Sequence, residues 1–350
     1  MQRRGQEYTL IHGDTYGLSK ANHAGPPQKE ERSEDQAAAG RRNRKRRPCE
    51  DEPEAKRERE QEKVPTYGDN GRLRPRARPS KPLWKERAQK YYKKGELLGQ
   101  GGYGSVYAGI RKSDGQPVAL KYVDKFEGYD MELPGYKEPI PKEVALMQAV
   151  NAAPAHDNIL QLQQWFDRKW SYAMVLERVD PCKDLWSYMD DRGAELNEEE
   201  ARSVTVQLLQ ALRHCEERGV VHRDVKPDNI LLRTDTGQLK LIDFGCSDAL
   251  KDEAYDDFSG TPEYLPPEWF EEHRFLAGPG TVWSVGVTLF KLVCGTLPFK
   301  TFTRESMSRL HYKAGLSPEL RDFIGWCLRP RPEERPSLEM LLCHPWLQQF

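Results

Sequence analysis

Two short segments in the second half of the chain carry side chains suited to phosphoryl transfer. Residues 222–229 read HRDVKPDN, and residues 243–245 read DFG. The carboxylate of Asp224 can orient an attacking hydroxyl and accept its proton, while Asn229 and Asp243 can hold Mg²⁺ ions that neutralise a triphosphate. We therefore expect Asp224 to be catalytic, and Asn229 and Asp243 to be metal ligands.

A glycine-rich segment, GQGGYGSV, lies upstream at residues 99–106. A dinucleotide-binding fold would need a helix directly after the glycines, but residues 106–109 alternate like a strand. We expect a hairpin over the phosphates, in which Gly99, Gly101 and Gly104 let the backbone approach closely. An ordinary tight hairpin without a ligand is the alternative interpretation.

A lysine and a glutamate complete the set of chemically suited residues. Lys121 ends the apolar run VALK at residues 118–121, and Glu143 follows Pro141 in a segment with helical character. The Lys121 ammonium can contact phosphates if Glu143 holds it in place. Glu143 and Met147 share one helix face because they are four residues apart.

These motifs, in this order, resemble the eukaryotic protein kinases. The resemblance implies an α+β, two-lobed fold: a small antiparallel β lobe with one main helix, from about residue 91 to 178, and a larger helical lobe from 179 to 347. It also implies ATP and Mg²⁺ as cofactors and a catalytic role for Lys121, Glu143, Asp224 and Lys226.

Lys226, together with Thr261 in the segment GTPEYLPPE at 260–268, resembles the serine/threonine class. Glu268 of that segment is expected to form a buried ion pair with Arg335 that braces the lower lobe. Matches such as LERVDP at 176–181 and LKLID at 239–243 are similar to the Pim family. The resemblance runs from about residue 91 to Trp346.

The family pattern also implies the nucleotide contacts. Val106 and Ala119 from above and Leu231 from below are expected to sandwich the adenine, and backbone groups near Glu177 and Val179 to bind its edge. The remaining expected cofactor-binding residues are Leu98, Gly99, Gly101, Gly104 and Lys121. Met147, Leu162, His222 and Phe244 correspond to the kinase regulatory stack.

Charged residues near the catalytic segment suggest how substrates and the loop are controlled. Asp184 and Asp228 are expected to face basic side chains of protein substrates before the acceptor Ser or Thr. Arg223 is expected to pair with Asp257, which would order the loop without phosphorylation. Thr261 is assigned a regulatory role.

Several residues depart from the kinase pattern. Thr281 stands two residues before Trp283, where kinases generally carry an aspartate that anchors the catalytic loop; Pim kinases also lack it. Val179 stands where Pim kinases carry a hinge proline. Ser187, Thr296 and Lys300 stand where acidic substrate-binding residues are expected, so selection for distant basic residues should be weak.

The first 85 residues differ in composition from the rest. They are poor in aliphatics and rich in charged residues, Pro and Gly, so they are expected to form a disordered tail. The basic run from Arg41 to Pro48 predicts contact with a nuclear import receptor, and a merely solvated tail is the equal alternative. Nucleic acid is not expected as a partner.

Cysteine usage and hydropathy point to an intracellular protein, in the nucleus, the cytoplasm or both. The 7 cysteines form no C-x-x-C pair, which favours reduced thiols. The apolar run from Thr281 to Cys294 is predicted to be a buried helix that is too short to span a membrane. We expect a monomer with no membrane partner.

Two function classes remain: an active serine/threonine kinase, and a pseudokinase that serves as a kinase-shaped binding module. A pseudokinase is expected to lack at least one of Lys121, Asp224, Asn229 and Asp243. All four are present, which favours the enzyme.

Overall fold

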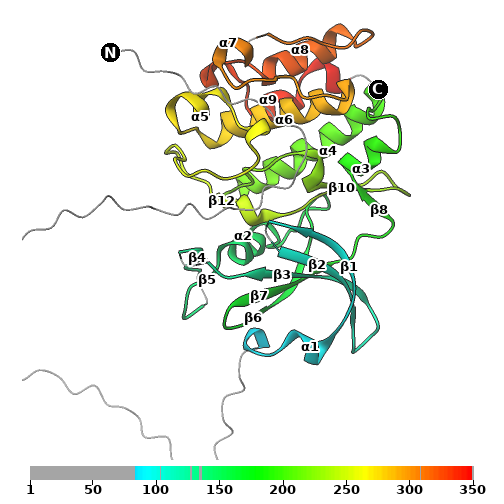
Figure 1. Ribbon diagram of the computed structural model, residues 1–350, viewed down its shortest axis with the longest axis vertical. Helices are drawn as coiled ribbons and strands as arrows, with labels where there is room; N and C mark the ends of the chain where they lie inside the picture. The colour runs from blue at the N-terminus through cyan, green and yellow to red at the C-terminus, as the bar shows by residue number, and fades with distance from the viewer. Residues whose placement is uncertain (1–82, 103, 127, 134–135, 308, 349–350) are drawn as a thin grey trace, which may run out of the picture. The chain divides into compact units, whose positions relative to one another are not determined.

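The computed structural model describes residues 83–102, 104–126, 128–133, 136–307 and 309–348. The predicted tail, including the basic run at residues 41–48, lies outside these residues. Within them, a small lobe built on a β-sheet precedes a larger helical lobe, as the two-lobed prediction requires (Figure 1). The candidate site lies where the two lobes meet.

The small lobe is built on an antiparallel sheet in the order β1-β2-β3-β7-β6. Its strands are β1 (Tyr92–Gly101), β2 (Gly104–Arg111), β3 (Pro117–Asp124), β6 (Leu162–Asp167) and β7 (Ser171–Glu177). Successive residues of β7 face opposite sides, because side chains alternate along a strand. Tyr172, Met174 and Leu176 join the main core, whereas Ala173 and Val175 join a separate outer cluster.

Helix α2 (Lys142–Val150) covers one face of the sheet, and the short strands β4 (Asp130–Met131) and β5 (Ile140–Pro141) precede it. Its buried residues include Glu143 and Met147, as the spacing predicted. The helix therefore turns a carboxylate inward, toward β3.

The large lobe is formed mainly by helices around α4 (Glu198–Glu217) and α6 (Ala277–Cys294). Asn197 caps α4: its side chain accepts a hydrogen bond from Glu200 N at 2.9 Å, and the Glu200 carboxylate accepts one from Asn197 N. Gly219, just beyond the helix, has φ +70°, which suits a glycine after a helix end. The other helices are α3 (Leu185–Asp190), α5 (Pro267–Glu272), α7 (Arg304–Met307), α8 (Pro318–Cys327) and α9 (Leu338–Leu342).

Short elements in this lobe hold the functional loops. They are β8 (Cys182–Asp184), β9 (Val220–Val221), η2 (Pro227–Asn229), β10 (Ile230–Arg233), β11 (Leu239–Leu241), η3 (Phe244–Cys246), β12 (Asp248–Ala249), η4 (Pro262–Tyr264), η5 (Pro332–Glu334) and η6 (Pro345–Gln348). Antiparallel pairing of β10 with β11 brings the two metal-ligand candidates, which lie just before β10 and after β11, to the same place.

Folded structure begins earlier than the sequence analysis predicted. The element η1 (Leu83–Lys85) and the helix α1 (Ala88–Tyr91) precede β1, so η1 occupies the last three residues of the expected tail. Trp84 stacks on Trp165 of β6, with ring centroids 5.2 Å apart. A single tryptophan in a charged segment anchors these residues, and composition averaged over the segment conceals it.

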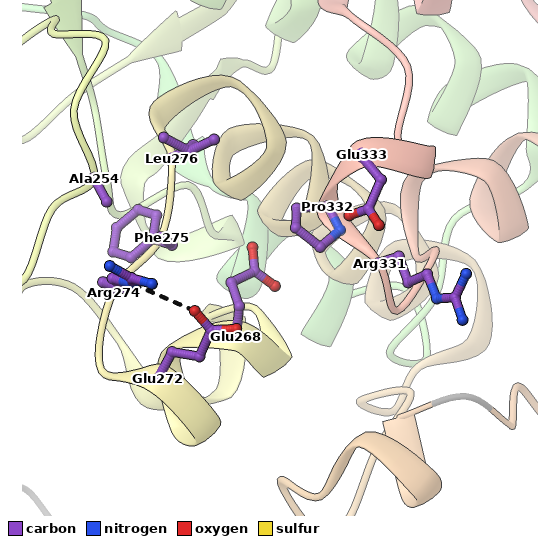
Figure 2. A pocket seen from close by; sticks show the side chains of 9 residues that line it. All are labelled: Ala254, Glu268, Glu272, Arg274, Phe275, Leu276, Arg331, Pro332 and Glu333. Atoms are coloured by element: carbon purple, nitrogen blue, oxygen red, sulfur yellow. Dashed lines mark hydrogen bonds and ion pairs between the residues drawn. The ribbon is translucent and has the colours of Figure 1, made fainter.

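The predicted ion pair between Glu268 and Arg335 braces the large lobe. Two guanidinium nitrogens of Arg335 donate to the two carboxylate oxygens of Glu268, each at 2.7 Å, and both residues are buried. A cavity of about 460 Å³ opens beside Glu268, and both charged residues, such as Glu272 and Arg331, and apolar residues, such as Phe275, line it (Figure 2). This cavity contains none of the predicted nucleotide-binding residues.

Among the described residues, α6 alone is long and apolar enough to cross a membrane, but 72% of it is buried inside the protein. It begins at Ala277, four residues before the predicted start of the apolar run. The helix is the central core helix of the large lobe.

Candidate active site

Three charged residues from different elements meet where the lobes join. Lys121 on β3 lies 2.5 Å from a carboxylate oxygen of Glu143 on α2, and 2.7 Å from Asp243 Oδ1. Lys121 and Glu143 are both buried, and Tyr172 on β7 donates a further hydrogen bond to Glu143 at 3.0 Å. The predicted lysine–glutamate pair is thus formed, and it extends to the metal-ligand candidate.

Burial and charge act in opposite directions on this group. Burial lowers the pKa of Lys121, but Glu143 and Asp243 outweigh it and hold that pKa above its usual value. Burial raises the pKa of Asp243, but Lys121 and the Gly245 N–H outweigh it and keep that pKa below its usual value. Lys121 and Asp243 are therefore both charged at neutral pH.

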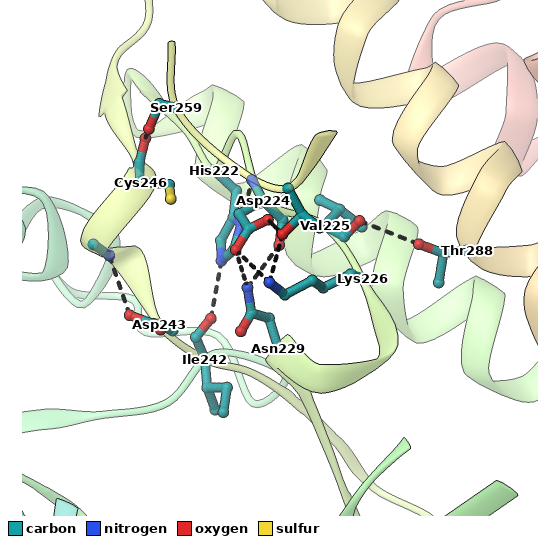
Figure 3. Close-up of polar contacts among 12 residues, drawn as sticks. His222, Asp224, Val225, Lys226, Asn229, Ile242, Asp243, Cys246, Ser259 and Thr288 are labelled. Carbon is teal, nitrogen blue, oxygen red and sulfur yellow. Dashed lines mark hydrogen bonds and ion pairs between the residues drawn. The ribbon is translucent and has the colours of Figure 1, made fainter. Parts of the chain in front are cut away.

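The catalytic loop places its groups around Asp224, which is buried (Figure 3). Asn229 Nδ2 donates to Asp224 Oδ2 at 2.7 Å and to the Asp224 carbonyl at 2.8 Å. The Thr261 hydroxyl donates to Asp224 Oδ1 at 2.7 Å and accepts from Lys226 Nζ at 2.5 Å. Asp224, Lys226, Asn229 and Thr261 therefore form one connected cluster.

His222 joins the catalytic loop to the segment that carries Asp243 (Figure 3). Its Nδ1 accepts from Asp224 N at 3.3 Å, so Nε2 carries the proton and donates to the Ile242 carbonyl at 3.0 Å. Burial lowers the pKa of His222, which favours this neutral form. The ring also packs edge-on against Phe244, with centroids 5.0 Å apart.

The predicted regulatory stack is assembled in the core. Met147, Phe244 and His222 are each no more than 2% exposed, and Leu162 packs against the same cluster. Helix α2 also packs against η3, which contains Phe244. This packing joins α2, which carries Glu143, to η3, which directly follows Asp243.

Arg223 pairs with Asp257 in the loop, as predicted. Its two terminal nitrogens donate to the two Asp257 carboxylate oxygens at 2.7 and 2.9 Å, and Arg223 Nε donates to the Cys246 carbonyl. These hydrogen bonds hold the pKa of Asp257 below its usual value. Gly260 has φ +100°, and a Cβ there would lie 2.5 Å from the Arg223 carbonyl oxygen, so the loop returns close against the catalytic segment.

Sequence reasoning missed a second acidic partner of Arg223. Asp248 on β12 lies 3.5 Å from Arg223 and 3.0 Å from Lys142 at the start of α2. No motif marks Asp248, because only the folded chain brings these elements together. Tyr172 was also missed, although its alternation with the buried residues Met174 and Leu176 predicts an inward side chain.

The departure at Thr281 leaves the catalytic loop with a different anchor. Thr281 is buried, but among the described residues its hydroxyl has no hydrogen-bond partner. On the same side of α6, three and seven residues after Thr281, the Ser284 hydroxyl donates to the Tyr264 carbonyl at 2.9 Å and the Thr288 hydroxyl donates to the Val225 carbonyl at 3.2 Å. The Thr288 hydroxyl of α6 therefore contacts the catalytic loop, for which kinases generally use a carboxylate as the anchor.

The glycine-rich segment forms the predicted hairpin between β1 and β2. A Cβ at Gly99 or Gly101 would meet no atom within 4 Å in the described residues, so packing within the protein does not require glycine there. Gly104 differs: its φ is +121°, and a Cβ would lie 2.1 Å from the Tyr122 carbonyl oxygen. Gly104 thus shapes the hairpin, whereas the space above Gly99 and Gly101 suits a close ligand.

The predicted adenine-binding residues lie on both sides of the junction. Ala119 belongs to the main core, and Val106 and Leu231 pack against it from the two lobes, while Leu98 is more exposed. Glu177 donates its N–H to the Gln161 carbonyl at 2.9 Å. The Val179 N–H has no hydrogen-bond partner among the described residues, so it remains available to a ligand.

The donor set fits Mg²⁺ brought in with a nucleotide. No group of three or more His, Cys, Asp or Glu side chains in the described residues forms a resident metal site. Asp243 and Asn229 supply a carboxylate and an amide oxygen, and Ile242 N donates to the Asn229 carbonyl at 3.0 Å, which holds the two ligands together. Mg²⁺ is usually bound by one or two carboxylates together with substrate phosphates.

The two predicted substrate-binding acids differ in their surroundings. Asp184 caps α3: its two carboxylate oxygens accept from the backbone N and the hydroxyl of Ser187, at 2.8 and 2.9 Å. Asp228 is exposed and has no hydrogen bond or ion pair with any described residue. Of these two acids, only Asp228 has a carboxylate without a hydrogen bond or ion pair to a described residue.

Residues 92–347 match the family model described as the protein kinase domain. The chain belongs to the protein kinase family. The match includes every site residue of the kinase described above, from Leu98 in the hairpin to Thr261 in the loop.

Curated relatives narrow the class of this kinase. It is 42% identical over 272 residues to a serine/threonine-protein kinase, pim-2, from Danio rerio, a match that covers 76% of this chain and 87% of the relative. It is 34% identical to a serine/threonine-protein kinase, prk-2, from Caenorhabditis elegans, with 75% of this chain and 59% of the relative covered. The kinase is therefore a serine/threonine protein kinase that resembles the Pim kinases.

Proposed function

We propose that this kinase transfers the γ-phosphoryl group of Mg·ATP to serine and threonine hydroxyls of protein substrates. The observation that carries the proposal is the cluster of Asp224, Lys226, Asn229 and Thr261 beside the ion pair of Lys121 and Asp243. The pseudokinase interpretation has no such support. The four residues of which a pseudokinase is expected to lack at least one are all present, and Asn229 contacts Asp224 while Lys121 contacts Asp243.

Each residue has a defined part in this chemistry. Asp224 orients the acceptor hydroxyl and takes its proton, and Lys226 and Thr261 hold the carboxylate in place. Lys121 contacts phosphate oxygens and is itself positioned by Glu143. Asn229 and Asp243 would hold the magnesium ions, which supply charge neutralisation for the triphosphate when bound.

We also propose that the kinase is active without loop phosphorylation. A loop phosphate commonly orders such a segment by pairing with an arginine. Here the Asp257 carboxylate already accepts two hydrogen bonds from Arg223, and the carboxylate of Asp248 lies 3.5 Å from the same guanidinium.

The experiment that tests the activity uses purified kinase, Mg·ATP and a degenerate Ser/Thr peptide library. We expect wild-type kinase to phosphorylate the library, with arginine selected about three residues before the acceptor. Asp243→Asn and Lys121→Met should each lower turnover by at least about a hundredfold, because electrostatic placement of phosphates supplies most of the rate enhancement. Thermal melting of both variants is the control for folding, and near wild-type turnover by Asp243→Asn would contradict the assigned metal ligand.

For the cellular setting we propose a monomer that enters the nucleus through an import receptor bound to the basic run at residues 41–48. The support is the density of Arg and Lys in this run. Replacing Arg44, Lys45, Arg46 and Arg47 with alanine should shift a fluorescent fusion to the cytoplasm with in vitro activity unchanged. An unaltered distribution would leave the run as a solvated segment.

A further inference from the structure

One carboxylate of the large lobe lies between two cations that belong to different parts of the site. Asp248 is on β12, which packs against α2 where the two lobes meet (Figure 1). Its Oδ2 is 3.0 Å from Lys142 Nζ at the start of α2 and 3.5 Å from a terminal nitrogen of Arg223. Its Oδ1 accepts a hydrogen bond from Ala249 N at 2.9 Å, which orients the carboxylate. One oxygen atom therefore contacts both the helix that carries Glu143 and the arginine of the catalytic loop.

Strand pairing places Asp248 between these cations. Strand β12 pairs with β9, and Asp248 lies opposite Val221, two residues before Arg223. The side chains of Arg223, Lys142 and Asp248 are only 2%, 20% and 24% exposed. Charges at this depth are screened by salt much less than charges on the surface. The contact can therefore hold two elements together.

The backbone of Arg223 depends on such contacts. Its φ is +64°, in the left-handed region that residues with a side chain rarely adopt, so the surroundings must hold this conformation. Burial lowers the pKa of Arg223, but Asp257 and Asp248 outweigh it and hold that pKa above its usual value. Asp248 therefore helps to hold the residue directly before Asp224.

On the other side of the carboxylate, Lys142 leads to the nucleotide-binding residues. Lys142 is the first residue of α2, and Glu143 follows it in the same turn. Glu143 lies 2.5 Å from Lys121 Nζ. A shift of this turn away from β12 would therefore draw the Glu143 carboxylate away from Lys121.

We propose that Asp248 is a positioning residue, which holds the first turn of α2 in place by contacting Lys142 and Arg223 at once. This contact keeps Glu143 beside Lys121. The proposal rests on the proposed kinase function, in which Lys121 contacts phosphate oxygens. It gives a carboxylate outside the kinase motifs a role in nucleotide binding.

The test measures the helix and the reaction separately. Hydrogen exchange of the ligand-free full chain reports how often α2 opens, and steady-state assays give KM for ATP and for an acceptor peptide. Asp248→Asn keeps the shape of the side chain and removes its charge. We expect exchange of residues 142–147 to become about threefold to tenfold faster and KM for ATP to rise by a similar factor, while KM for the peptide changes little.

Asp114→Asn is the matched control. Asp114 also lies 3.0 Å from a cation, but its partner Arg111 is only three residues away in the chain, so this pair joins no distant elements. The control should leave the exchange of α2 and KM for ATP unchanged. Equal changes in the two variants, or no change in Asp248→Asn, would overturn the proposal.

An exchange of charges separates a bridge from a simple ion pair. Lys142→Asp combined with Asp248→Lys restores opposite charges between α2 and β12, but it puts a cation beside Arg223, so we expect no recovery. Full recovery would show that Arg223 does not share the carboxylate, and would also overturn the proposal. If hydrogen exchange changed as expected while the wild type phosphorylated no peptide, the role of Asp248 in holding α2 would stand and the proposed kinase activity would fail.

Discussion

At the scale of single residues, the hinge between the lobes is one place where this kinase departs from the Pim pattern. A proline at position 179 would have no N–H, whereas Val179 supplies one that has no partner among the described residues. The Val179 carbonyl accepts from the Cys182 thiol at 3.1 Å, which holds the backbone at this point.

We therefore expect Val179→Pro to weaken inhibitors that bind both hinge hydrogen-bonding positions. The loss should be about 0.5–1.5 kcal/mol, the usual worth of one hydrogen bond, and isothermal titration calorimetry measures it directly. An inhibitor that bonds only to the Glu177 backbone is the control and should bind both proteins alike. Equal affinity of the two proteins for the bidentate compound would show that the Val179 N–H does not reach the ligand.

At the scale of elements, the loop between η3 and η4 is held by charge. Arg223 is almost fully buried, whereas Asp257 keeps about half of its side chain exposed. Without Asp257 the buried guanidinium would keep only the more distant carboxylate of Asp248, at 3.5 Å, as an acidic partner among the described residues, so the loop gains order from the contact with Asp257.

Asp257→Ala should lower kcat/KM by about tenfold and make the loop more sensitive to protease, because the loop loses its main ordering contact. Asp256→Ala removes a neighbouring carboxylate with no ion pair among the described residues and should have little effect. Treatment with phosphatase should leave the wild-type rate unchanged. A large loss after that treatment alone would show that a loop phosphate is required.

Local sequence signals predicted the elements that depend on neighbouring residues. The inward Glu143 and the hairpin at residues 99–106 both follow from spacing of a few positions. The contacts that sequence reasoning missed join distant segments: Trp84 with Trp165, and Asp248 with Lys142. Such pairs depend on how elements pack, and no short-range pattern contains that information.

At the scale of the whole molecule, the large lobe depends on one buried ion pair. Arg335 donates to both oxygens of Glu268 and also to the carbonyls of Pro279, Arg329 and Pro330. Its guanidinium lies 4.9 Å from the ring centroid of the buried Trp283. The pair therefore ties the segment around α5 to α6 and to η5.

Arg335→Met should reduce the free energy of unfolding by about 3–5 kcal/mol, because it leaves the Glu268 carboxylate buried without a partner. Urea denaturation measures the change. Arg331→Met is the control: its side chain is 66% exposed and, among the described residues, forms an ion pair only with Glu334, so its loss should cost less than about 1 kcal/mol. A similar loss of unfolding free energy in the two variants would show that the buried ion pair does not stabilise the large lobe.

The contact of Lys121 with both Glu143 and Asp243 has a consequence for how ligands compete. A ligand that binds only a rarely populated state has a weaker apparent affinity, because its apparent Kd is the intrinsic Kd divided by the population of that state. Nucleotides and inhibitors that bind while Lys121 contacts both Glu143 and Asp243 keep their full affinity. A compound that needs Phe244 displaced must first break its packing with His222 and separate Lys121 from Asp243, so this kinase should select against that inhibitor class.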